Sequence, residues 1–126
     1  MSQAKQALLE IAKNAVALAQ RSGAQDAVAA THRTREVEIG WRDGTVEKVS
    51  ESASRGLSLA LYVDGRYSAV STSDLRPDAL ERFVGESVAL ARALAPDEHR
   101  ALPDPKLYQG RSDADLQLAD PAYAEL

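Results

Sequence analysis

The stretch LSLALYVDGRYSAVSTSDL, residues 57–75, contains the clearest structural signal in the chain. Its first half alternates apolar residues with smaller or polar ones, which is typical of a strand with one buried face. Asp64-Gly65 then supplies the two positive-φ positions that a type I′ hairpin turn requires. The predicted register places Val63 opposite Arg66, Leu61 opposite Ser68, Leu59 opposite Val70, and Leu57 opposite Thr72.

A second hairpin is predicted just upstream. From Asp26 the apolar period is two, and Val37, Ile39 and Trp41 share one face of a long or bent strand. Asp43-Gly44 is another two-residue turn signal, and the return strand begins with TVEKVSESAS. Val46 and Val49 fall on opposite parities, so we expect a β-bulge near Glu47-Lys48. Arg55-Gly56 is interpreted as a corner, which makes an antiparallel meander of about four strands.

Two helices flank these strands in the prediction. Residues 3–21 carry an apolar stripe at three- and four-residue steps, and Gly23 follows as a left-handed C-terminal residue. Pro77 suits the first position of a second helix, which extends to about Ala95 before Pro96. The expected class is therefore α+β, with both helices packed on the sheet. We divide the chain into an α+β domain, residues 1–100, and an extended Pro/Asp-rich tail, residues 101–126.

The composition and charge of the chain limit the classes of function that it can have. The chain has 126 residues, no cysteine and a net charge of −4, so disulfides and thiol nucleophiles are excluded and a phosphate backbone is a poor partner. We find neither a secretory signal nor a run long enough to span a membrane, and we expect a cytoplasmic protein that binds no membrane and no nucleic acid. Trp41, Phe83 and a few tyrosines are expected to be the only large fillers of a core otherwise built mainly from alanine and leucine.

No residue pattern indicates catalysis, a cofactor or a metal. The two histidines, His32 and His99, have no metal-ligand spacing, and the tail acids lack the spacing of a calcium loop. Those acids are Asp104, Asp113, Asp115 and Asp120. The alternating serines 50, 52 and 54 are interpreted as exposed strand residues, because a nucleophile needs an adjacent base. An acid/base pair of Glu36 with Glu51 is the one enzymatic alternative, and nothing in its spacing argues for it.

The chain resembles the N-terminal domain of the TldD/PmbA family, on the PmbA (TldE) side. The resemblance is carried by RSGAQDAVA, by WRDGTVEKVSESASRGLSLALYVDGRYSAVSTSDL, by PDALERFVGESVALARAL and by the LPDP that follows. It covers residues 20–105 almost without a gap. STSDL belongs to this pattern, where the sheet meets the second helix.

The resemblance implies a cytoplasmic metallopeptidase complex of TldD-like and PmbA-like subunits that handles unstructured peptides. The family's zinc motif, HExxxH, belongs to the C-terminal part of the TldD-like subunit. This chain is expected to be truncated relative to the family and to have no catalytic, cofactor-binding or metal-binding residue of its own. Its implied role is assembly with a TldD-like subunit, or self-association, and shaping the peptide path. The alternative is a stand-alone adaptor or dimerisation module. The name "modulator of DNA gyrase" also accompanies the family.

Overall fold

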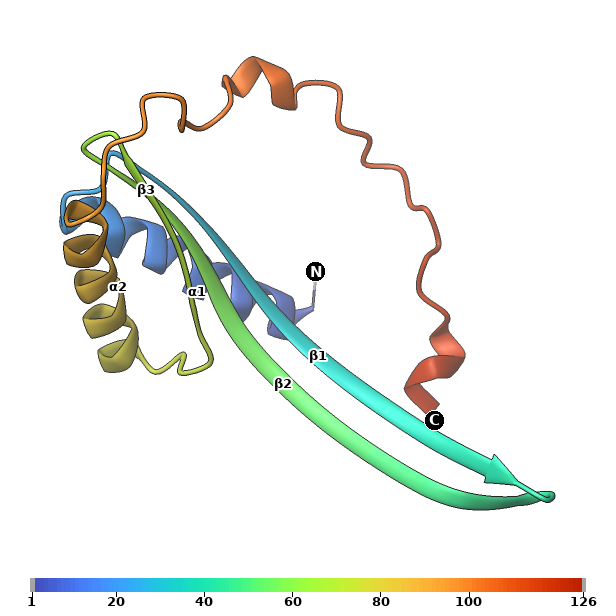
Figure 1. Cartoon of the computed structure of the whole chain (residues 1–126). Helices are drawn as coiled ribbons and strands as arrows, with labels where there is room; N and C mark the ends of the chain where they lie inside the picture. The colour runs from blue at the N-terminus through green and yellow to red at the C-terminus, as the bar shows by residue number, and fades with distance from the viewer. Residues whose placement is uncertain (1, 126) are drawn as a thin grey trace.

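The computed structural model describes residues 2–125. The main elements are α1 (Gln3–Arg21), β1 (Asp26–Arg42), β2 (Thr45–Val63), β3 (Arg66–Thr72) and α2 (Pro77–Arg92). Two short 3-10 helices follow, η1 (Pro105–Tyr108) and η2 (Pro121–Glu125). The strands form one antiparallel sheet in the order β1-β2-β3. Both helices pack on the same face of this sheet, and the opposite face is left open (Figure 1). The predicted α+β class is confirmed.

The sheet has three strands, so the prediction of about four is wrong. β2 runs without interruption through Arg55 and Gly56, because Gly56 still pairs with His32 of β1. A Cβ atom on Gly56 would lie 2.7 Å from His32 Cε1. The glycine therefore marks a close cross-strand approach of a side chain to the backbone, and it does not mark a corner.

The hairpin geometry agrees with the sequence in detail. All four predicted pairs between β2 and β3 are confirmed. Both residues of each turn have positive φ, with 49° and 77° at Asp43 and Gly44 and 49° and 73° at Asp64 and Gly65. The bulge is also confirmed, since Gly40 pairs with Lys48 and Trp41 pairs with Val46, which leaves Glu47 as the extra residue.

The core lies between the sheet and the helices. Its centre is the inward face of β2, where Leu57, Leu59, Leu61 and Val63 are at most 1% exposed. Small residues of α1 and larger ones of α2 cover this face: Ala15, Ala19, Leu80, Val84, Val88 and Ala91. Phe83 packs against the cluster as predicted. Trp41 does not, because it is 66% exposed on a part of β1 that neither helix covers.

The helix ends follow local chemistry. α1 has the predicted bounds, and Gly23 has a φ of 109°. α2 ends at Arg92, a few residues before the predicted end near Ala95. The chain leaves the helix axis there because the Asp97 N–H donates to the Gly65 carbonyl and the Arg66 side chain donates to the Leu94 carbonyl. Two contacts with the β2–β3 turn therefore redirect the chain.

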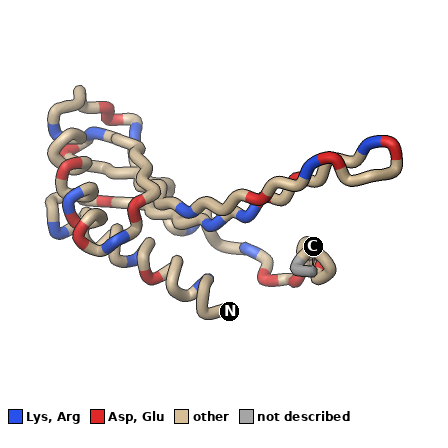
Figure 2. Tube along the Cα trace, turned by 90° about the horizontal axis from the view of Figure 1, so that it is seen from below, with Lys and Arg blue, Asp and Glu red and all other residues tan. Residues whose placement is uncertain are grey.

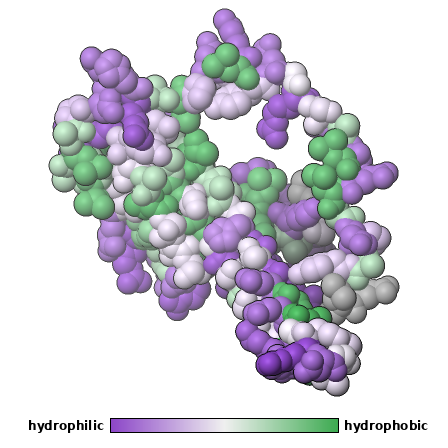
Figure 3. Space-filling view, turned by 45° about the vertical axis from the view of Figure 1, so that its right-hand side comes forward, coloured by the Kyte–Doolittle hydropathy of each residue, from purple (hydrophilic) through white to green (hydrophobic). Residues whose placement is uncertain are grey.

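The tail arches away from the body and returns to β1 (Figures 1 and 3). Arg100 first stacks over the Tyr67 ring, 4.5 Å from its centroid. The chain then makes η1, passes through the strongly exposed Leu116 and Leu118, and reaches η2. There the Tyr123 hydroxyl donates to the Arg35 carbonyl. The boundary between a domain at 1–100 and a tail at 101–126 stays a prediction.

Candidate functional site

The most distinctive surface is the far half of the β1–β2 hairpin. β3 ends at Thr72, opposite Leu57, so residues 33–42 and 45–56 continue as a two-stranded ribbon beyond the body (Figure 1). A two-stranded hairpin is only marginally stable in water without a covering layer. We call this segment the ribbon.

One face of the ribbon is apolar towards its tip. Directly opposed residues share a face, and the bulge at Glu47 brings Val46 opposite Trp41. Trp41, Ile39, Val46 and Val49 are 66%, 51%, 50% and 66% exposed. With Val37 they form a continuous set, which we call the apolar patch. Single exposed apolar residues are ordinary, but a contiguous set on a projecting arm is typical of an interaction surface.

The same face becomes basic towards the body. Arg33 and Arg55 lie directly opposite one another across the two strands. Like charges in this position repel, and neither arginine has a salt bridge to a side chain of residues 2–123. A hollow of about 200 Å³ lies beside them, lined also by Ala53 and Ser54. We call Arg33 and Arg55 the root arginines, and an anionic or aromatic partner group would relieve their repulsion.

The other face of the ribbon is polar. Ser50, Ser52 and Ser54 lie on it, opposite Glu38, Glu36 and Thr34. Lys48 forms an ion pair with Glu38 at 3.0 Å, and Ser50 donates to the same carboxylate. The serines are exposed, as the sequence predicts.

The hypothetical Glu36 and Glu51 pair is wrong, because these residues occupy opposite faces of the ribbon. Glu36 pairs with Ser52 across the strands, whereas Glu51 pairs with Val37. Glu51 instead accepts a 2.6 Å hydrogen bond from Arg35, which lowers the pKa of the Glu51 carboxyl. A carboxylate held in its charged form by arginine is poorly suited to serve as an acid.

The histidines lie at separate places. His32 lines a hollow of about 620 Å³ with Ser54, Gly56 and Ser73, at the notch where β3 leaves the edge of β2. His99 is in the tail, 3.7 Å from Glu98 and strongly exposed. Among the side chains of residues 2–123 no cluster of three or more His, Cys, Asp or Glu could hold a metal ion. None of the described helices combines the length and apolar character needed to cross a membrane.

Charges of both signs alternate along the ribbon (Figure 2). Arg35 with Glu51, Lys48 with Glu38 and Arg42 with Glu47 form ion pairs across the two strands. Such interleaving gives no continuous basic stripe in the described part of the ribbon, and a stripe is what a nucleic-acid backbone recognises.

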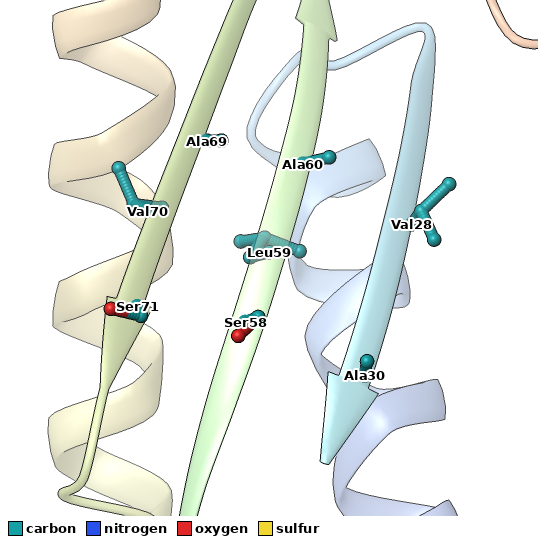
Figure 4. A pocket seen from close by; sticks show the side chains of 8 residues that line it. All are labelled: Val28, Ala30, Ser58, Leu59, Ala60, Ala69, Val70 and Ser71. Atoms are coloured by element: carbon teal, nitrogen blue, oxygen red, sulfur yellow. The ribbon is translucent and has the colours of Figure 1, made fainter.

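The open face of the sheet offers a second, shallower surface. A groove of about 380 Å³ crosses all three strands (Figure 4). The side chains along it are small: Val28, Ala30, Ser58, Ala60, Ala69 and Ser71. Small side chains allow another layer to approach closely, but they present few groups that could orient a ligand.

The STSDL segment has a structural role between the sheet and α2. The Asp74 N–H donates to the Thr72 hydroxyl, and the Asp74 carboxylate accepts from both the backbone N–H and the guanidinium of Arg76. The side-chain bond from Arg76 is the main reason why the pKa of Asp74 falls to about 2. These bonds fix the chain direction just before Pro77 begins the helix.

This geometry gives a prediction for pH. We expect the Asp74 carboxyl to titrate at about 2 by NMR, and Arg76→Ala to return the midpoint towards the ordinary ~3.9. Because the folded-state pKa is the lower one, the contribution to stability is present above the ordinary pKa and is lost as pH falls through about 2. A midpoint that Arg76→Ala leaves unchanged would contradict the assignment.

The family model for PmbA/TldA metallopeptidase domain 1 matches residues 27–91, which is more than half of the chain and spans the sheet and nearly all of α2. The chain belongs to the PmbA/TldD family. It is 31% identical over 121 residues to the metalloprotease PmbA of Escherichia coli O157:H7, covering 95% of this chain and 26% of that protein. The chain thus spans about a quarter of the length of this curated relative.

Solved structures agree with the family. A Bacteroides thetaiotaomicron protein that carries the name modulator of DNA gyrase superposes with a TM-score of 0.85 at 35% identity, over 93% of this chain and 26% of its own. TldE from Thermococcus kodakarensis has a TM-score of 0.63 at 17% identity, over 75% of this chain and 22% of its own, and supports the fold. The predicted resemblance to the TldD/PmbA family is confirmed.

Proposed function

We propose that this chain is the non-catalytic N-terminal domain of a PmbA/TldE-like subunit in a metallopeptidase complex. Its role in this proposal is subunit assembly with a TldD-like subunit or by self-association, together with shaping the path of unstructured peptides. The zinc and the catalytic groups belong to the TldD-like subunit. Family membership and the cysteine-free sequence support a cytoplasmic setting for this assembly.

The observation that carries the proposal is the unpartnered apolar patch on the ribbon. Its largest member, Trp41, is 66% exposed, although tryptophan is a residue type that stable interfaces bury at their centres. The ribbon also projects away from the core, so its stability depends on what covers it. An assembly surface accounts for both features.

The peptide path is supported by free strand edges. An extended peptide can add to an exposed edge through main-chain hydrogen bonds, with little demand on its sequence. The sequence indicates residues 27–41 and 66–73 as candidate edges. The structure adds residues 45–56 of β2, whose side away from β1 has no strand beside it because β3 stops at Thr72.

The proposal predicts that the chain co-purifies with a TldD-like subunit when the two are co-expressed, and that Trp41→Ser abolishes this association. Leu118→Ala is the matched control, because Leu118 is 88% exposed in the tail.

Equilibrium dialysis of the chain alone should give no tight, stoichiometric zinc endpoint, and the chain should cleave no peptide. Stoichiometric zinc would contradict the non-catalytic role, whereas a chain that ignores the TldD-like subunit would favour the stand-alone adaptor.

A further inference from the structure

We propose that the notch at the end of β3 binds the C-terminal carboxylate of an extended peptide, whose last residues pair with the free edge of β2 in the parallel direction. The notch is the hollow of about 620 Å³ whose lining includes His32, Ser54, Arg55 and Ser73. The inference rests on the peptide path proposed above, and it names the end of the peptide that this edge holds.

The free edge of β2 begins at the notch. The two-residue turn makes Val63 and Arg66 a hydrogen-bonded pair, so alternate residues of β2, counted back from Val63, direct their N–H and C=O groups towards β3. β3 uses these groups only as far as Leu57. In the described structure no strand lies beside the groups that follow. They belong to Arg55, Ala53, Glu51 and Val49.

This edge is long enough to hold a short peptide. From Val49 to Arg55 it spans roughly 20 Å at the usual rise of a strand, which about six residues of an extended peptide would cover. The described tail contacts the opposite edge of the ribbon. Arg35 lies opposite Ala53, so its carbonyl points away from β2, and it is this carbonyl that accepts from the Tyr123 hydroxyl.

The notch carries hydrogen-bond donors suited to a carboxylate. The His32 ring lies across Gly56, since a Cβ atom on this glycine would be 3.1 Å from His32 Nε2 and 3.2 Å from the Thr72 carbonyl oxygen. The ring therefore reaches from β1 to the end of β3. Ser54 and Ser73 line the same hollow, and neither their hydroxyls nor the His32 ring has a hydrogen-bond partner among residues 2–123.

The charges at the notch favour a carboxylate over an ammonium group. Arg55 lines the notch, and Arg33 lies opposite it on β1. Neither guanidinium has a salt bridge to a side chain of residues 2–123. The carboxylates of Glu51 and Asp74, which lie on either side along the chain, are each held by another arginine at 2.6 Å. The positive charge of the notch is therefore not neutralised from within the described chain.

This charge sets the direction of the peptide. A peptide antiparallel to β2 would continue the line of β3 and bring its N-terminal ammonium group to the notch, where the arginines would repel it. A peptide parallel to β2 brings its carboxylate instead, which a guanidinium can bind through two parallel N–H···O bonds. A parallel ladder is slightly less stable per residue, and the bound carboxylate offsets this difference.

Fluorescence anisotropy with a labelled peptide tests the role of the carboxylate. The probe is a short peptide of alternating valine and threonine that carries fluorescein at its N-terminus and ends in a free carboxylate. We expect it to bind roughly tenfold more tightly than the same peptide with a C-terminal amide. Acetate in tenfold excess over the probe should displace none of it, because acetate cannot pair with the edge.

Arg55→Ala tests the charge of the notch. It should weaken binding of the free acid about tenfold and leave binding of the amide unchanged. Arg42→Ala is the matched control, because Arg42 is an exposed arginine beside the turn at the tip of the ribbon. This control should change the binding of neither peptide. Circular dichroism checks that both variants are folded.

Ala53→Pro tests the backbone pairing. The N–H of Ala53 points away from β1, so proline removes a donor that only the peptide uses, and edge strands tolerate proline in this orientation. Binding of the acid and of the amide should both be lost, while circular dichroism shows a folded chain. Ala53→Val keeps the N–H and should bind as the unaltered chain does.

Each failure has its own meaning. Equal affinities for acid and amide would reject recognition of the carboxylate, displacement by acetate would reduce the notch to a site for a simple anion, and binding insensitive to Ala53→Pro would place the peptide elsewhere. A chain that binds no peptide but still captures a TldD-like subunit through Trp41 would reject this inference and leave the assembly role intact. Peptide binding at the notch without that capture would support the inference and reject the assembly role.

Discussion

Leu61→Ala is expected to lower the free energy of unfolding by about 3 kcal/mol, within the range of roughly 2 to 5 kcal/mol for a buried leucine. Leu61 is fully buried in the middle of β2, with Ala27 of β1 and Ser68 of β3 as its cross-strand neighbours. Both cross-strand neighbours have short side chains, so neither can reach in to fill the cavity. Urea denaturation followed by circular dichroism measures the change.

Leu118→Ala makes the matched control for this experiment. The same chemical change at an 88% exposed tail position should alter the free energy of unfolding by less than about 0.5 kcal/mol. If both variants lost less than about 1 kcal/mol, the inward face of β2 would not be the core of this domain. A Leu61→Ala variant that fails to fold would agree with the prediction, since small domains are only marginally stable.

Gly23→Ala is expected to lower the free energy of unfolding by about 2 kcal/mol. Gly23 has a φ of 109°, a backbone conformation in which a Cβ atom is strained. A Cβ atom there would also lie 2.1 Å from Nη2 of Arg92. That guanidinium donates to the Ser22 carbonyl and approaches the Asp64 carboxylate at 3.9 Å, so displacing it weakens both contacts.

Gly85→Ala is the opposite case and controls for the added methyl group. Gly85 lies inside α2, and a Cβ atom there would meet nothing within 4 Å. The substitution should therefore raise the free energy of unfolding by about 0.8 kcal/mol, because alanine is the better helix former. The midpoint temperature of thermal unfolding should fall for Gly23→Ala and rise for Gly85→Ala. Shifts of the same sign would show that the cost at Gly23 does not come from its backbone conformation.

Local signals explain why much of the fold could be predicted. The β2–β3 register follows from the alternation of leucines up to Val63 and from Asp64-Gly65, which are all within a few residues of one another. The bulge at Glu47 was visible in the broken parity of two valines. Helix α1 has a full apolar stripe and a glycine at its end. Each of these features depends on neighbours in the sequence.

The errors arose where one residue type serves two purposes. The sequence predicts a corner at Gly56, but in the structure this glycine makes room for the His32 ring of the neighbouring strand. Glycine in a strand can mark either feature, and only the partner strand distinguishes them. The sequence predicts Trp41 in the core because large apolar residues are usually buried. Its exposure depends on the length of the helices, which do not reach that part of β1.

The surface formed by the apolar patch and the root arginines could be predicted only in part, because it also depends on which strand pairs with which. The sequence indicates that Val37, Ile39 and Trp41 share a face, since strand periodicity requires it. It does not show that the root arginines lie opposite one another, because a corner at Arg55-Gly56 would have separated them. The unbroken pairing of β2 with β1 creates both the ribbon and its charge pattern.

The residues alone were enough to predict the turns, the strand parity, the register of the β2–β3 hairpin, both helices and the family. These depend on short-range sterics and on the burial period of each element, which a single chain states directly. Only the tertiary structure decided that three strands form the sheet, that the apolar tip of the ribbon lies outside the core, and that the root arginines face one another. The reason is physical. Whether a side chain is buried or unpaired depends on which distant segment covers it, and the local sequence around a residue does not specify that segment.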